Sequence, residues 1–492
     1  MTRFASRLVL LPDRFLYATP ASLDLPFQEV EFWSNRGVRL RGWFIPGPRR
    51  GVVVFCPGNS GNASSHLEYV RLANQGGHSV LAFDYAGFGR SEGVPDLKRI
   101  VPDVEAACQF AQFHTRQPVA LFGLSLGAAA AVAAAVRGGA EVTAVIGEGI
   151  ADFPSMLRGL LASGTFGPRR IRSIAGPDGV LREREAVQLS GLRLPGVLAG
   201  LVARVGATLY PFAGKSPLRL APQLAGRPVF LIHGVEDPLL PFEAAIDLYE
   251  AVDGPRWLWL IPGVGHAQEP VMACPAEYAA KLTAFLDGAF EGSVEKPQAA
   301  RILDIHAHQP VHGGVTALLG LEAPVGPAAQ SRSVSVTASG GGVLRQAILR
   351  GHAEVTMEFP GPIEIMVTSP LLAADEGPMA REYTSAGYRQ AFNAMSRAVN
   401  RRDFSGLAAA VDAHRSLPRA YPYDFFAALY SLRAAQVALG LVPHWRCGDS
   451  GAAVQALERF LELWCAHSRL PGPSVPESPA SWAEKKLEEE RR

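Results

Sequence analysis

The sequence predicts an α/β fold in which a mostly parallel sheet carries helices on both faces. Apolar runs of strand length alternate with helical patterns over nearly 300 residues, which is typical of this architecture. One run, Gly51–Cys56, is continuously apolar, as a strand buried on both faces should be. Polar, glycine-rich loops follow several of these runs. In open parallel sheets, functional groups lie in the loops at the carboxyl ends of the strands, so these loops are where a site is expected.

The expected elements succeed one another in a regular order. An antiparallel hairpin is expected first, from Phe27–Phe32 and Val38–Ile45, joined through Asn35-Arg36-Gly37. Further strands are expected at Gly51–Cys56, Ser79–Phe83, Pro118–Phe122, Val142–Ile146, Val229–Ile232 and Trp257–Ile261. Helices are expected near Ser64–Asn74, Asp103–Phe113, Ala128–Val136, Phe242–Val252 and Ala276–Phe290.

The bulk composition narrows the class of protein. With 492 residues the chain exceeds one ordinary core, so two or three domains are expected. A net charge of +1 gives no reason to expect nucleic acid as a partner. The five cysteines are scattered without metal-ligand spacing and predict a reducing compartment rather than a disulfide framework. Met1–Phe15 does not have the pattern of a signal peptide, so a cytoplasmic location is expected.

Four regions are expected along the chain. Residues 1–294 form the α/β domain, into which 152–216 is inserted as a cap of short helices. Residues 295–380 hold β-like runs, and 381–467 show helical periodicity with Asp449 or Ser450 as a cap. The tail, 468–492, is Pro/Ser-rich and then charged, and is expected to be disordered. Within the cap, Leu194–Phe212 suits a lid over the site or a contact with a membrane surface.

The most informative motif is Gly123-Leu-Ser-Leu-Gly127, which stands between an expected strand and an Ala-rich expected helix. A serine on such a sharp strand-to-helix turn is the nucleophile elbow of serine hydrolases. The turn exposes the Ser125 hydroxyl and places the Leu126 N–H at a helix N-terminus, where it would stabilise an oxyanion. The motif alone is a weak signal, because glycine and serine are common in loops.

A serine nucleophile needs a base and an acid that orients the base. Asp237 follows the strand Val229–Ile232, and His266 follows the strand Trp257–Ile261, which gives the chain order Ser125, Asp237, His266. Glu236 or Asp152 is an alternative acid if Asp237 only caps the next helix. His233 lies at a strand end and is expected to pack under the loop rather than to act as base.

The second oxyanion-hole donor is expected in the loop after Cys56, and the Asn59 N–H is the candidate there. Other polar residues carry less weight. Asp84 and Ser91 are expected to stabilise the second glycine-rich loop. His306 and His308 have a spacing that metal ligands can have, but partner carboxylates are missing, so we expect no metal.

Four segments in one linear order resemble the alpha/beta-hydrolase superfamily over roughly residues 8–290: Pro57-Gly-Asn-Ser-Gly-Asn62, Phe83-Asp-Tyr-Ala-Gly-Phe-Gly-Arg-Ser91, Gly123–Gly127, and Gly234–Asp237 with Gly265-His266. The oxyanion loop is similar to that of the branch containing bud-emergence-type and serine aminopeptidase-like hydrolases. Two departures stand out. Pro57 replaces a usual histidine, so a hydrogen bond to the oxyanion loop is expected to be absent. Ala86 replaces a usual arginine, so local packing is expected to differ.

The resemblance and the residues together predict a serine acyl hydrolase that acts on a small-molecule ester or thioester without a cofactor. Two other interpretations stay open. An aminopeptidase would need an acidic subsite for the substrate amine, which Glu148 or Asp152 would supply. A degenerate scaffold would instead bind a protein partner through the C-terminal helical region, for which the resemblance offers no role.

Overall fold

The protein is described from a computed structural model. The described residues are 10–12, 14–138, 142–150, 216–234, 237, 240, 242–261, 264–273, 275–294, 391, 394–395, 398, 403–417, 423–441, 449–467, 470–475 and 478–491, together with the backbone of strands within 165–188 and 301–372.

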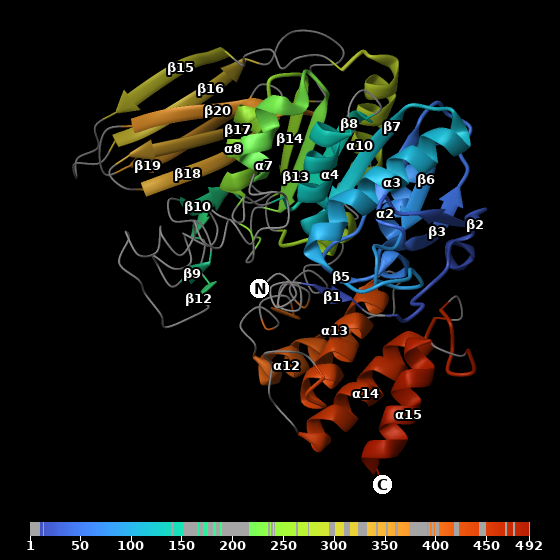
Figure 1. Cartoon of the computed structure of the whole chain (residues 1–492). Coiled ribbons are helices and arrows are strands. Elements are labelled where there is room, and N and C mark those ends of the chain that lie inside the picture. Colours follow the sequence, from blue (N-terminus) through green and yellow to red (C-terminus); the bar gives the residue numbers. More distant parts are fainter. Residues whose placement is uncertain are drawn as a thin grey trace, which may run out of the picture.

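A central sheet of eight strands in the order β14-β13-β8-β7-β4-β6-β3-β2 organises the N-terminal domain (Figure 1). The hairpin β2–β3 is antiparallel, β3 pairs antiparallel with β6, and the strands from β6 to β14 are parallel. The predicted α/β fold is therefore confirmed. The strands are β2 (Gln28–Trp33), β3 (Arg39–Ile45), β4 (Val52–Cys56), β6 (Ser79–Phe83), β7 (Val119–Leu124), β8 (Val142–Glu148), β13 (Val229–Gly234) and β14 (Arg256–Ile261).

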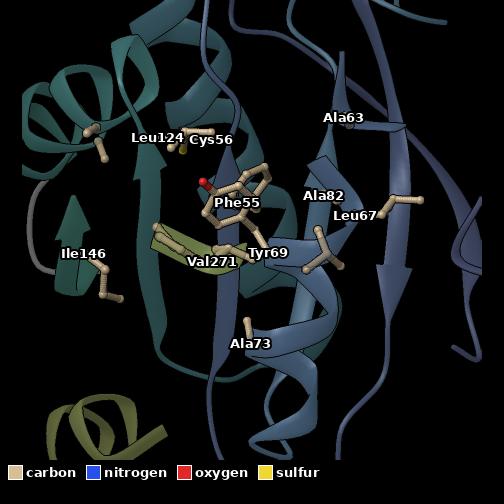
Figure 2. Packing of buried hydrophobic residues seen from close by; sticks show 14 of the residues in the cluster. Phe55, Cys56, Ala63, Leu67, Tyr69, Ala73, Ala82, Leu124, Ile146 and Val271 are labelled. Atoms are coloured by element: carbon tan, nitrogen blue, oxygen red, sulfur yellow. The ribbon is translucent and has the colours of Figure 1, made fainter. Parts of the chain in front are cut away.

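The central strands are apolar over almost their whole length because both faces of the sheet are buried. Every residue of β4, β7 and β13 is buried, because helices cover both faces of the sheet. Figure 2 shows Tyr69 on α2 beside Phe55 on β4, and their rings stack with centroids 5.7 Å apart. The helices of this domain are α2 (Leu67–Gln75), α3 (Leu97–Thr115), α4 (Leu126–Arg137), α7 (Pro217–Leu220), α8 (Glu243–Ala251), α9 (Gln268–Ala273) and α10 (Pro275–Glu291), with short 3-10 turns at Pro20–Leu23, Ala63–His66 and Ala221–Leu224.

One helix begins earlier than predicted. The sequence pattern suggested a start at Asp103, whereas α3 begins at Leu97, where the Asp96 side chain accepts a hydrogen bond from the Lys98 N–H. The N-cap fixes the first turn, and Pro102 lies within the helix without ending it.

The cap differs from the expectation of short helices. The parts of 152–216 for which the structure describes backbone elements are strands. Leucine and arginine content favoured helices, whereas the β-branched residues that recur here favour strands. These strands are β9 (Thr165–Phe166), β10 (Ile171–Ala175), β11 (Leu181–Glu183) and β12 (Val187–Gln188). The strand β10 pairs in parallel with β18 of the C-terminal half.

The range 295–380 contains six described strands in two sheets, one of which also takes in β10 and β11. In Figure 1 these strands lie on the side of β14, which is an edge of the central sheet. Their bounds are β15 (Arg301–His308), β16 (Val315–Glu322), β17 (Arg332–Gly340), β18 (Val343–Arg350), β19 (Ala353–Phe359) and β20 (Ile363–Leu372).

The C-terminal helices lie below the sheet in Figure 1, and each packs against the next: α12 (Phe404–Arg415), α13 (Tyr423–Ala438), α14 (Ser450–Cys465) and α15 (Pro479–Arg491). Asp449 caps α14 by accepting from the Ala452 N–H. The last helix corrects the expectation of a disordered tail. Ala480, Ala483 and Leu487 form a buried stripe at helical spacing, and this burial outweighs the charged composition around it.

Candidate active site

Ser125 occupies the turn between β7 and α4, with φ 55° and ψ −112°. A non-glycine residue in this left-handed region is strained and is held there only by its surroundings. The neighbouring glycines explain how the turn fits. A β-carbon on Gly127 would collide with the carbonyls of Cys56 and Pro57, and one on Gly123 would lie 2.5 Å from the Ala128 nitrogen. The backbone at Ser125 is further fixed by its N–H, which donates to the Glu148 carbonyl at 2.8 Å.

The structure brings Ser125, His266 and Asp237 into one relay. His266 Nε2 lies 3.2 Å from Ser125 Oγ, and His266 Nδ1 lies 2.5 Å from Asp237 Oδ2. Ser125 follows β7, Asp237 follows β13 and His266 follows β14, so their loops meet at the carboxyl edge of the parallel sheet. Such a chain can move a proton from the serine hydroxyl to the imidazole while a carboxylate holds the imidazole in place.

The charges of Asp237 and His266 suit a proton transfer between Ser125 and His266. Burial opposes ionisation of Asp237, but the charge of His266 and hydrogen bonds from His233 and His266 outweigh it and hold the pKa of Asp237 well below its usual range. Burial likewise disfavours protonated His266, yet the charge and hydrogen bond of Asp237, with Glu269, raise the pKa of His266 above its usual 6.5. Asp237 is 1% exposed and His266 12% exposed, so the imidazole is the part that faces the solvent side.

Asp237 is held by more than its contact with His266. The Leu240 N–H donates to Asp237 Oδ1 at 2.8 Å, and His233 Nε2 lies 3.3 Å from Asp237 Oδ2. His233 is fully buried and its Nε2 is also 2.9 Å from the Leu240 carbonyl, which is the packing role expected for it. The alternative acids Glu236 and Asp152 lie outside the described residues.

The loop that carries His266 depends on a residue that the sequence reasoning missed. The Gly265 N–H donates to Glu269 Oε2 at 2.6 Å, and Glu269 is 5% exposed on α9. A β-carbon on Gly265 would lie 2.6 Å from both carboxylate oxygens, so the close approach requires glycine. The acidic residue in the first turn of a helix, three positions after His266, was the available signal.

The loop after β4 passes close to Ser125. A β-carbon on Gly58 would lie 3.9 Å from the Ser125 β-carbon, and Asn59 is the next residue of this loop. Leu126 is the first residue of α4, in the turn whose N–H groups have no intrahelical acceptor. At Pro57, where a histidine was expected from the resemblance, the carbonyl accepts from the Tyr85 hydroxyl at 3.1 Å.

The second glycine-rich loop supports the oxyanion loop. Asp84 Oδ1 accepts from the Ala63 N–H at 2.8 Å, and Asp84 Oδ2 accepts from the Arg90 N–H at 3.1 Å. The Ser91 hydroxyl donates to the Asp84 carbonyl at 2.7 Å. Asp84 and Ser91 therefore stabilise this loop, which is the role expected for them, and Asp84 also holds the Ala63 N–H of the loop after β4. At the position of the missing arginine, the Ala86 N–H donates to Asp103 Oδ2 at 2.9 Å.

Glu148 is the last residue of β8, next to the turn that carries Ser125, and it is fully buried. The Tyr69 hydroxyl donates to its Oε1 at 2.8 Å and the Tyr278 hydroxyl to its Oε2 at 2.5 Å. Burial raises the pKa of Glu148 to about 8, against the lowering effect of both hydroxyls. The expectation of an acidic subsite at Glu148 is therefore wrong, because this carboxyl faces two tyrosines and is closed to a substrate amine.

The remaining candidates bear on metals and membranes. Among the described residues, no group of three or more His, Cys, Asp or Glu side chains is arranged to hold a metal ion. His306 and His308 lie on β15, whose side chains fall outside the description. None of the helices in the described part of the chain combines the length and the apolar character needed to cross a bilayer.

Comparison with known proteins assigns the family. The sequence model described as alpha/beta hydrolase family matches residues 53–281. WAV2 of Arabidopsis thaliana, an alpha/beta hydrolase domain-containing protein, is 32% identical over 258 residues, which cover 49% of this chain and 73% of WAV2. The chain belongs to the alpha/beta hydrolase family, and residues 53–281 carry its hydrolase domain.

Two further similarities have the same extent. YfhR of Escherichia coli O157:H7 is 28% identical over 274 residues, covering 54% of this chain and 81% of YfhR. An esterase from Pyrococcus furiosus matches in structure over 57% of this chain and 98% of its own, with 20% identity and a TM-score of 0.43. The family match ends at residue 281, before the C-terminal strands and helices begin.

Proposed function

We propose that this hydrolase is a serine acyl hydrolase in which Ser125 is the nucleophile, His266 the general base and acid, and Asp237 the residue that orients His266. The observation that carries the proposal is the continuous relay, with 3.2 Å between Ser125 Oγ and His266 Nε2 and 2.5 Å between His266 Nδ1 and Asp237 Oδ2. Nucleophile, base and orienting acid at these separations are the signature of covalent acyl transfer.

The reaction runs in two halves. The Ser125 oxygen bonds to the acyl carbon as its proton passes to His266 Nε2, and the carbonyl π electrons move onto oxygen. The Asn59 and Leu126 N–H groups stabilise that oxyanion. Its collapse breaks the bond to the leaving group, which departs with the proton from His266. A water molecule then attacks the acyl-enzyme by the same sequence, releasing the acid and restoring the Ser125 hydroxyl.

Esters and thioesters are the proposed substrates. An alkoxide or thiolate leaves with a single protonation by His266, and no charged subsite is needed. An aminopeptidase needs a buried or semi-buried carboxylate that a substrate amine can reach. Glu148 does not meet that need, since both of its oxygens accept from tyrosine hydroxyls and its exposed fraction is 0%.

The test is turnover of p-nitrophenyl esters of increasing acyl length, beside matched aminoacyl p-nitroanilides. We expect ester hydrolysis that Ser125→Ala lowers to the uncatalysed background, and slower or undetectable anilide cleavage. Ser293→Ala, which changes an exposed serine two residues after α10 ends, is the matched control and should keep wild-type turnover. Ester turnover that survives Ser125→Ala, or a preference for anilides, would overturn the proposal.

A further inference from the structure

A short N-terminal segment lies along the oxyanion loop. This strap, residues 10–12 and 14–17, contributes β1 (Leu11–Pro12), which pairs in parallel with β5 (Ser60–Gly61) inside that loop. The Leu11 N–H donates to the Asn59 carbonyl at 2.8 Å. The strap therefore binds the carbonyl of Asn59, the residue whose N–H is proposed to stabilise the oxyanion. This hydrogen bond fixes the peptide plane that follows Asn59.

Side chains of the loop bind the rest of the strap. Asn62 Nδ2 donates to the Phe15 carbonyl at 2.7 Å, and the Ser64 hydroxyl lies 3.3 Å from the same carbonyl. The Tyr17 N–H donates to Ser64 Oγ at 2.9 Å. Asn62 and Ser64 are both buried, so these bonds form away from competing water and resist displacement.

The other side of the strap faces the C-terminal helices. The Phe15 ring meets Trp482 of α15 edge-on with centroids 5.5 Å apart, and the Tyr17 ring meets Trp464 of α14 at 6.3 Å. Tyr17 is 5% exposed and Trp464 is fully buried. In Figure 1, β1 and β5 lie between the central sheet and these helices. The strap is thus a layer between the oxyanion loop and the C-terminal helices.

The two tryptophans are themselves held firmly. Trp464 Nε1 donates to the Pro471 carbonyl at 3.0 Å, and the Trp464 ring packs on Phe425 and Phe460 with centroids 5.5 and 5.3 Å away. The helix α15 that carries Trp482 buries Ala480 and Ala483. The indole rings therefore present a fixed surface to the strap.

The oxyanion loop is anchored from two directions. Asp84 holds the Ala63 N–H from within the hydrolase domain, and the strap holds Asn59, Asn62 and Ser64 from outside it. The strap in turn contacts Trp464 and Trp482 on helices beyond residue 281, where the family match ends. A loop that must keep a backbone N–H within hydrogen-bond distance of a transient charge loses catalysis when it shifts by an ångström.

We infer that the helices α14 and α15 position the oxyanion loop through the strap, with Trp464 and Trp482 as positioning residues that act through Tyr17 and Phe15. The catalytic consequence rests on the proposed function, whereas the structural consequence does not. The C-terminal helices are thereby part of the catalytic unit of this hydrolase. Their packing against the strap affects the turnover rate, although the helices do not contact the substrate.

The experiment uses the full chain with Trp482→Ala, because Trp482 is only partly buried and its loss leaves the core of α14 intact. Trp482→Phe is the conservative variant that keeps an aromatic ring against Phe15. Trp33→Ala is the matched control, since Trp33 is 66% exposed on the edge strand β2. Two readouts are taken: hydrogen exchange of peptides spanning 57–66, and kcat and KM for a p-nitrophenyl ester.

In Trp482→Ala, amides of 57–66 should exchange about tenfold faster, while those of β13 and β14 keep wild-type rates. The kcat should fall about tenfold, less than the 10²–10³ lost with a whole oxyanion donor, and KM should stay within about twofold. Trp482→Phe should recover most of both, and Phe15→Ala should give the same effect without adding to Trp482→Ala.

Unchanged exchange at 57–66 in Trp482→Ala overturns the inference, and so does faster exchange throughout the hydrolase domain, which would indicate general destabilisation. A rise in KM with unchanged kcat also contradicts it, because that places the helices at substrate binding. If the wild type turns over no ester, the proposed function fails, and the exchange rates alone still decide whether the helices hold the loop.

Discussion

Gly149 and His266 are in such close contact that a β-carbon on Gly149 would lie 3.0 Å from His266 Cε1 and 3.2 Å from Nδ1. Gly149 has φ +58°, and its N–H donates to the Ile232 carbonyl at 2.9 Å. The residue directly after Glu148 therefore forms the wall against which the imidazole rests. We expect this wall to help align the His266 ring between Ser125 and Asp237.

Gly149→Ala should lower kcat about 10²-fold, because the added methyl pushes the ring out of line by a fraction of an ångström. The positive φ adds strain of about 1 kcal/mol, so stability should fall only modestly. Steady-state kinetics and thermal unfolding of the same preparation check this. A variant with wild-type kcat would show that the imidazole position does not depend on this wall.

Asp237→Asn should lower kcat about 10⁴-fold, because an amide favours the wrong imidazole tautomer. The pH dependence should change as well. Activity requires neutral His266, and Asp237 raises the pKa of His266 above 6.5, so the acidic limb of the wild-type profile lies above that value. In the variant the residual activity should have its acidic limb at lower pH. An unmoved limb would mean that another group titrates.

Glu148→Gln tests the buried carboxyl through stability. The pKa of Glu148 is raised from 4.5 to about 8, so between these values the folded chain keeps a proton that the unfolded chain has lost. Wild-type stability therefore loses up to about 1.4 kcal/mol per pH unit from this group as the pH rises from 5 to 8. Glutamine cannot ionise and lacks that loss.

The free energy of unfolding of both proteins should be measured in denaturant at pH 5, 6.5 and 8. The difference between Glu148→Gln and wild type should move in favour of the variant as the pH rises. A difference that stays constant over this range would show that Glu148 is ionised in the folded protein at pH 5, in conflict with its enclosure.

A buried cluster stabilises the C-terminal helices. His414 Nε2 donates to Asp424 Oδ1 and His467 Nε2 donates to Asp424 Oδ2, both at 2.9 Å, and Asp424 and His414 are fully buried. Asp424→Ala removes both acceptors and should cost about 1–3 kcal/mol of unfolding free energy. Leu441→Ala, at a residue 54% exposed, is the control and should change stability by less than about 0.5 kcal/mol. Equal stabilities of the two variants would contradict this role.

The central sheet could be predicted because its signal is local. Strands such as Val52–Cys56 are apolar over their whole length, and each is followed at once by a polar loop. Parallel strands then force Ser125, Asp237 and His266 to one edge, whatever the details of the intervening chain. The relay could therefore be assembled from three short stretches of sequence that are far apart along the chain.

The contacts that hold the site residues in place could not be predicted in the same way, because they join segments that are far apart in the sequence. Tyr69 and Tyr278 enclose Glu148 from helices that lie on either side of it in sequence, so nothing local marked that carboxyl as buried. The strap meets Asn59 through a backbone pair and meets Trp482 through a ring contact. Both relations depend on tertiary packing, not on composition.

The prediction that residues 468–492 are disordered was wrong for a different reason. Composition around Glu484–Arg492 suggested a solvated segment, but Ala480, Ala483 and Leu487 repeat at helical spacing and are buried. A narrow apolar stripe is enough to stabilise a charged helix when the stripe packs against a neighbouring helix. The stripe was visible in the sequence, whereas the surface that covers it was not.

Covalent labelling of the full chain by a fluorophosphonate, with the modified peptide located by mass spectrometry, tests the role of Ser125 most directly. We expect one phosphonyl group per chain on Ser125, loss of labelling in Ser125→Ala, and much slower labelling in Asp237→Asn. Labelling of a different residue, or labelling that persists in Ser125→Ala, would contradict this role.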